Sequence, residues 1–134
     1  MKPILISIIA SLITMLAIDT IWLRVMYSRF YEPNIGHLLA PAVNYGAAVV
    51  FYLIYTVGLS ILVIIPSIEG SFSIGRTFFL GAVFGLVAYG TYDFTNHATL
   101  KDWPAIVSIV DIIWGSILTG TVALASRRAT DWLA

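Results

Sequence analysis

The sequence predicts an all-α integral membrane protein, a four-transmembrane-helix up-down bundle that forms one domain over residues 1–134. The chain is 60% hydrophobic and 10% charged, and its mean hydropathy of +0.95 lies outside the range of soluble domains. Its apolar residues gather in four runs, each near the roughly 20 residues that a helix needs to cross a bilayer core. Because lipid cannot satisfy open backbone, helices are the expected spanning structure. The predicted spans are residues 3–23, 42–65, 77–95 and 104–125.

The first run begins after Lys2 and has the outline of a signal peptide. It is too long for a signal core, it contains Asp19, and no small-residue cleavage pattern follows it. We therefore expect a retained first span.

The connections follow from the spans. We expect a loop at residues 24–41, a turn rich in Ser and Gly at 66–76, and a tight link between the third and fourth spans. Gly81 and Gly85 form one small-residue face, and Ser116 with Gly120 forms another, which favours close helix contacts.

The distribution of basic residues bears on orientation. Four spans place both termini on one side of the membrane, and a slight excess of basic residues there favours cytoplasmic termini. The near balance leaves insertion in both orientations as an alternative. The basic residues are Lys2, Arg76, Arg127 and Arg128 on the terminal side, and Arg24, Arg29 and Lys101 on the other.

Composition also excludes some functions. Seven basic and seven acidic residues give a net charge of zero, so no basic surface is available for nucleic acid, and the expected partner is the lipid bilayer. The chain has no cysteine, which excludes disulfides and thiolate chemistry.

Two of the spans carry the same polar pattern, Asp19-x-x-Trp22 in the first and Asp111-x-x-Trp114 in the fourth. Since these helices run in opposite directions, both acids lie in the same half of the membrane, about 7 Å and about 12 Å from their helix ends. Residues three apart share a helix face, so each indole N–H is placed to donate to the acid of its own helix. Ionisable groups inside a membrane are expensive and usually functional.

The remaining spans add polar groups at the same end. The third ends there with Asp93, Asn96 and His97, and the second begins there with Asn44. Asn96 and His97 share a face with Asp93 and are its expected donors. We therefore predict that the three intramembrane acids converge.

The tryptophans divide into two groups. Trp22, Trp103 and Trp132 suit an aromatic belt at the membrane interface. Trp114 lies about 16 Å inside its helix, so we expect it to pack within the bundle or line a cavity.

The segments YGTYDFTNHATLKDWP and VDIIWGSILTGTVA resemble an uncharacterised bacterial membrane family, domain of unknown function 2177. In that family a YD-x-TN-x-ATL-x-x-WP stretch leads into a D-x-x-WG helix. The resemblance extends to the Asp and Trp of the first span and covers nearly the whole chain. It implies a small four-span protein of the bacterial inner membrane and supplies no established activity. The positions that match the pattern are Tyr92, Asp93, Thr95, Asn96, Asp111, Trp114 and Gly115, whereas His97 falls on a spacer position.

We predict binding or transport of a small polar or cationic ligand, with proton coupling, because a membrane carboxylate among Tyr, Trp and Asn side chains can exchange a proton for a cation. Four helices enclose little volume, so transport implies a homo-oligomer. The sequence specifies neither a cofactor nor a metal. The predicted ligand-binding residues are Asp19, Trp22, Asn44, Tyr92, Asp93, Asn96, His97, Asp111 and Trp114.

Two other functions stay open. One is a membrane-embedded enzyme that acts on a lipid or head group through carboxylate and His acid–base chemistry or a divalent metal, although no catalytic motif is present. The other is an accessory or structural subunit in which the acids form a polar packing clasp. A clasp predicts acids with satisfied hydrogen bonds in a closed bundle, whereas binding or catalysis predicts a cavity that reaches Asp111.

Overall fold

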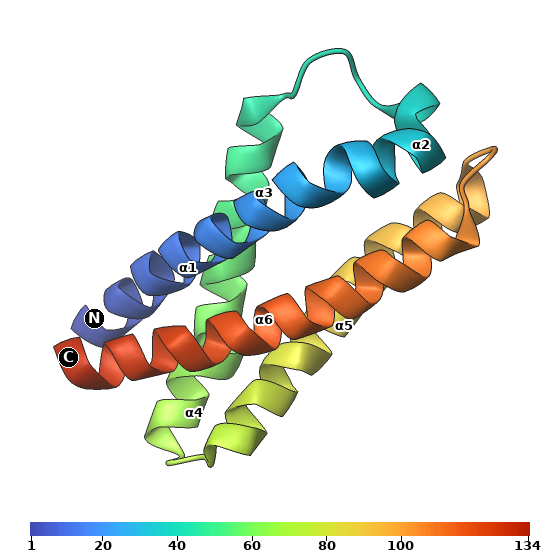
Figure 1. The fold of residues 1–134 in the computed structure, drawn as a ribbon. Coiled ribbons are helices and arrows are strands. Elements are labelled where there is room, and N and C mark those ends of the chain that lie inside the picture. The colour runs from blue at the N-terminus through green and yellow to red at the C-terminus, as the bar shows by residue number, and fades with distance from the viewer.

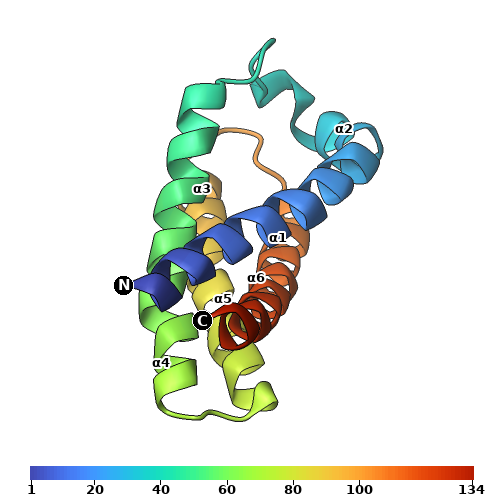
Figure 2. The same cartoon turned by 90° about the vertical axis from the view of Figure 1, so that its left-hand side faces the viewer.

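The computed structural model describes all of residues 1–134 as four long helical rods without a strand (Figure 1). Each rod is long and apolar enough to cross a membrane. The N- and C-termini lie at the same end of the bundle in both views (Figures 1 and 2), as four alternating spans require. The fold confirms the predicted all-α membrane class.

The first rod is longer than its predicted span. Helix α1 (Lys2–Met26) continues through a wide π turn, η1 (Tyr27–Tyr31), into the short helix α2 (Glu32–Ile35) and the 3₁₀ turn η2 (Gly36–Leu38). The predicted loop at 24–41 is therefore wrong over most of its length.

The second rod has the same construction. Helix α3 (Tyr45–Leu59) continues through a second π turn, η3 (Ser60–Ile64), into α4 (Ile65–Glu69). The predicted turn at 66–76 is thus shorter than expected.

In each of the first two rods, a proline accounts for a helix end that was predicted too early. Pro33 is the second residue of α2 and Pro66 the second of α4, and each follows a π turn. A proline ring normally clashes with the carbonyl four residues earlier. A widened turn before the ring lets the helix continue, where the sequence alone suggested that it ends.

The third and fourth rods, α5 (Ile74–Thr99) and α6 (Ala105–Leu133), form the most extensive helix pairing in the molecule. Gly81 and Gly85 face α6 so closely that an added Cβ would overlap its backbone. The predicted first glycine face is confirmed. On α6, Gly120 contacts α5 as expected, but it is Gly115 and not Ser116 that completes the face.

The interior is unusually polar, and many large apolar side chains point outward. This is the arrangement expected where lipid is the solvent and small residues let helices approach. An apolar cluster that includes Met15, Leu59 and Leu118 lies at the centre. The buried Ser and Thr residues are Ser7, Ser11, Thr56, Ser60, Ser67, Thr77, Ser108, Thr119, Ser126 and Thr130.

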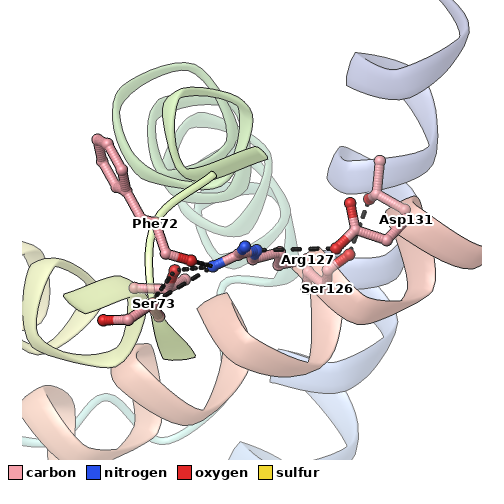
Figure 3. A network of polar contacts seen from close by, with 7 residues as sticks. Phe72, Ser73, Ser126, Arg127 and Asp131 are labelled. Atoms are coloured by element: carbon pink, nitrogen blue, oxygen red, sulfur yellow. Dashed lines mark hydrogen bonds and ion pairs between the residues drawn. The ribbon is translucent and has the colours of Figure 1, made fainter. Parts of the chain in front are cut away.

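Arg127 fastens α6 to the turn between α4 and α5 at the terminal end of the bundle (Figure 3). Its guanidinium donates to the Phe72 carbonyl at 2.6 Å and to the Thr77 hydroxyl, and it pairs with Asp131 at 3.7 Å. These contacts fix the end of the bundle that lies away from the polar groups of the spans.

Candidate functional site

A pocket of about 250 Å³ lies at the end of the bundle opposite the termini, between the first rod and the α5–α6 pair. All three intramembrane acids line it, so the predicted convergence is found in the geometry. Its acidic and aromatic lining consists of Asp19, Asp93 and Asp111 with Trp22, Tyr27, Tyr31, Tyr89, Tyr92, Trp103 and Trp114.

Asp19 is held by two hydrogen bonds from other helices. Tyr52 of α3 donates its hydroxyl to Oδ2 at 2.6 Å, and Trp114 of α6 donates its indole N–H to Oδ1 at 3.2 Å. The expected bond from Trp22 on the same helix is absent. Asp19 therefore joins three helices and has a donor on each oxygen.

A tyrosine of the first rod links Asp111 to that rod by hydrogen bonds. Trp22 donates to the hydroxyl of Tyr31 at 3.0 Å, and Tyr31 donates to Asp111 Oδ1 at 2.7 Å. The expected partner, Trp114, instead serves Asp19. The tryptophan of each Asp-x-x-Trp pattern is therefore linked to the acid of the other helix. This is possible because the antiparallel α1 and α6 present their polar faces to each other.

Asp93 differs from the other two acids. Its side chain is fully buried, and neither oxygen receives a hydrogen bond from any donor. The carboxyl of Asp111 lines the same pocket. Two carboxyl groups can bond to each other only if one of them carries a proton. Asp93 and Asp111, called the acid pair below, line one pocket, and of the two only Asp111 accepts a hydrogen bond.

Three predicted site residues lie elsewhere. Asn44 caps α3, where its side chain accepts the N–H of Ala47 at 3.1 Å. Asn96 and His97 do not line the pocket, and the Asp93 carboxylate accepts no bond from either of them. A spacing of three or four residues places side chains on one face but does not turn them toward each other.

Two tryptophans assigned to the interface belt are part of the site. Trp22 stacks on Trp114, and Trp103 is buried and donates to Ser108 at 3.0 Å. Trp132 is exposed, as a belt residue would be. Trp22 and Trp103 therefore line the pocket, and the extension of the first rod packs Ile35 against Trp103.

The short helix α2 closes the outer side of the pocket. Ile35 of α2 forms a small buried cluster with Trp103 and Val107, against which Tyr31 packs. Tyr27 and Tyr31, which line the pocket, both come from the π turn η1. Such turns are frequent at functional sites, where the extra residue changes the direction of side chains.

Tyr92 was among the predicted site residues and lines the pocket, but the other tyrosines of the site were not predicted. Tyr31 fell in a predicted loop, and Tyr52 and Tyr89 fell in apolar spans without a distinctive pattern. A tyrosine hydroxyl inside a span needs a partner, and that requirement was the available signal.

No three or more His, Cys, Asp or Glu side chains are grouped so that they could hold a metal ion. The acids line a common pocket without forming a ligand cluster of the kind that a divalent cation requires.

The fold and the pocket define a helical membrane protein of four spans with a buried acidic and aromatic site. The chain belongs to the family described as "Predicted membrane protein (DUF2177)", whose profile matches residues 4–127. Comparison with curated proteins and comparison with solved structures both gave no match.

Proposed function

We propose that this protein binds a small polar or cationic ligand at the Asp93–Asp111 pair and exchanges a proton for it. The observation that carries the proposal is the Asp93 carboxyl, which is fully buried and receives no hydrogen bond. Burying a polar group without a partner costs free energy, and such groups are rare unless they serve a function.

A cation suits the lining of the pocket. None of its lining residues is basic, so the chain itself supplies no counter-charge to the acids. Its walls are largely Tyr and Trp, whose ring faces attract ammonium groups. We expect the two neighbouring carboxyls to hold one proton between them, because two buried negative charges side by side are costly, and an ammonium ligand would replace that proton.

The two alternative functions, a packing clasp and a membrane enzyme, do not fit all three acids equally well. Asp19 fits a packing clasp, since both of its oxygens accept hydrogen bonds. Asp93 does not fit a clasp, because it has no donor. An acid pair also suits acid–base chemistry on a head group, but the metal-dependent form of that alternative has no supporting ligand cluster.

The proposal includes a location. We place the protein in the bacterial inner membrane with cytoplasmic termini, on the small excess of basic residues at the terminal end. The pocket then lies in the periplasmic half. Binding needs only one chain, whereas transport to the other side would require a homo-oligomer or a second opening.

Isothermal titration of the protein in lipid nanodiscs with tetramethylammonium tests the proposal. Wild-type protein is expected to bind, and Asp111→Asn is expected to lose binding, because it keeps the shape of the side chain and removes its charge. Asp102→Asn is the matched control: Asp102 lies outside the pocket in a left-handed turn (φ 59°), a conformation that Asn also adopts readily. Circular dichroism and gel filtration verify that the variants fold. Equal binding by Asp111→Asn and wild type would refute the proposal.

A further inference from the structure

A second hollow of about 500 Å³ lies between α3 and α5, next to the first pocket. Phe51 and Tyr55 of α3 form one wall, and residues 88–95 of α5 form most of the other. Ala88 is near the middle of α5, so the hollow extends toward the centre of the membrane.

The hollow exists because α3 stands apart from α5. Helix α3 packs on α1, and it is the following turn, η3, that packs on α1, α5 and α6 together. The second rod therefore packs against α5 and α6 at η3, and the hollow lies beside the α3 segment that precedes this turn. Phe51 of α3 and Tyr92 of α5, which line the hollow, are 43% and 56% exposed. In a membrane this opening faces lipid chains.

The two hollows meet at Asp111. Asp111, Tyr89 and Tyr92 line both of them. Asp111 is the only charged side chain in the wall of the second hollow.

The rest of that wall offers little to a polar ligand. The hydroxyls of Thr91 and Thr95 donate to carbonyls one turn earlier, at 2.6 Å and 2.5 Å. The Tyr55 hydroxyl is paired with Thr119 of α6. The hollow thus has an acidic end with two tyrosines, Tyr89 and Tyr92, that it shares with the first pocket, and its other walls are apolar or already satisfied.

We propose that the ligand is a membrane amphiphile with a cationic amine head and a single alkyl chain, and that it enters from the bilayer. The head lies at Asp111 and Asp93, and the chain lies in the hollow between α3 and α5. This inference rests on the proposed function, since it names the ligand class of the same acid pair.

Photolabelling in liposomes tests it. The probe is dodecylamine with a diazirine group on its chain, added to the full-length protein and mapped by mass spectrometry. Labelling is expected at residues 51–55 and 88–95, and excess tetramethylammonium is expected to abolish it by taking the place of the head. A dodecanol probe with the same diazirine is expected to leave these residues unlabelled, because it lacks the cation.

Two substitutions that each introduce phenylalanine separate the hollow from the lipid-facing surface. Ala88→Phe fills the hollow and is expected to lose labelling while it keeps tetramethylammonium binding. Val87→Phe, at a neighbouring exposed position outside the hollow, is expected to keep both. If Ala88→Phe does not fold, Thr91→Phe fills the same space.

The outcomes distinguish the two proposals. If wild-type protein does not bind tetramethylammonium, the proposed function fails and this inference fails with it. If tetramethylammonium binds but labelling is absent from residues 51–55 and 88–95, is insensitive to tetramethylammonium, or is equal in Ala88→Phe and Val87→Phe, only the amphiphile is rejected.

Discussion

Trp22 of α1 and Trp114 of α6 lie face to face, with ring centroids 4.1 Å apart and an interplanar angle of 6°. Each indole serves the acid of the other helix: Trp114 donates directly to Asp19, and Trp22 reaches Asp111 through Tyr31. The stack therefore joins two hydrogen-bond chains and holds the first rod against α6 beside the pocket.

This arrangement predicts that the two tryptophans are energetically coupled. In a double-mutant cycle of Trp22→Ala and Trp114→Ala, we expect a coupling of about 0.5–1.5 kcal/mol, the range for stacked aromatic pairs. Unfolding in mixed detergent micelles, followed by far-ultraviolet circular dichroism, measures it. Effects that add to within about 0.3 kcal/mol would show that the stack does not couple the helices.

The acids should differ in their effect on stability. Asp19→Ala leaves the Tyr52 hydroxyl and the Trp114 N–H without an acceptor, at an expected cost of about 1–2 kcal/mol. Asp93→Leu strands no donor and removes a buried unpaired carboxyl, so it should be neutral or stabilising. Thermal unfolding in one detergent compares the two variants. If Asp93→Leu lowers the stability as much as Asp19→Ala does, Asp93 belongs to the packing clasp.

Gly85 and Gly75 of α5 allow two Gly→Ala substitutions in one helix to be compared. A Cβ at Gly85 would lie 2.6 Å from the Thr119 hydroxyl and also overlap the backbone of α6, so Gly85→Ala is expected to destabilise by about 1–3 kcal/mol. Gly75 has no atom within 4 Å of its added Cβ, and Gly75→Ala should stabilise slightly through helix propensity. The same unfolding assay measures both. Equal effects would contradict the close contact between α5 and α6.

Orientation can be tested cleanly because the chain has no cysteine. His37 is exposed at the pocket end, and Ala134 lies at the terminal end. A membrane-impermeant maleimide added to intact cells should label His37→Cys and leave Ala134→Cys unlabelled. The reverse pattern would overturn the proposed orientation, and labelling of both would indicate insertion in two directions.

Hydrophobicity alone predicted the helical membrane class, because four apolar runs of spanning length have few other solutions in lipid. It could not predict where the rods end. Pro33 and Pro66 are ordinary signs of a helix boundary, and only a π turn before each one lets the helix continue.

For the site, helix direction was enough to place Asp19, Asp93 and Asp111 at one end of the bundle. Their hydrogen bonds were not predictable in the same way, because spacing within a helix says nothing about the neighbouring helix. Tyr31 and Tyr52 supply bonds to two of the acids, and each reaches its acid from a different element across the bundle.

The central claim is that the Asp93–Asp111 pair exchanges a proton for a cation. Titration of the wild-type protein with tetramethylammonium at one pH, in two buffers of different ionisation enthalpy, measures the protons released on binding. The account predicts release of about one proton per bound cation, and none from Asp93→Asn, in which no second carboxyl is left to share it. Binding by wild-type protein without proton release, or the same release from Asp93→Asn, would contradict it.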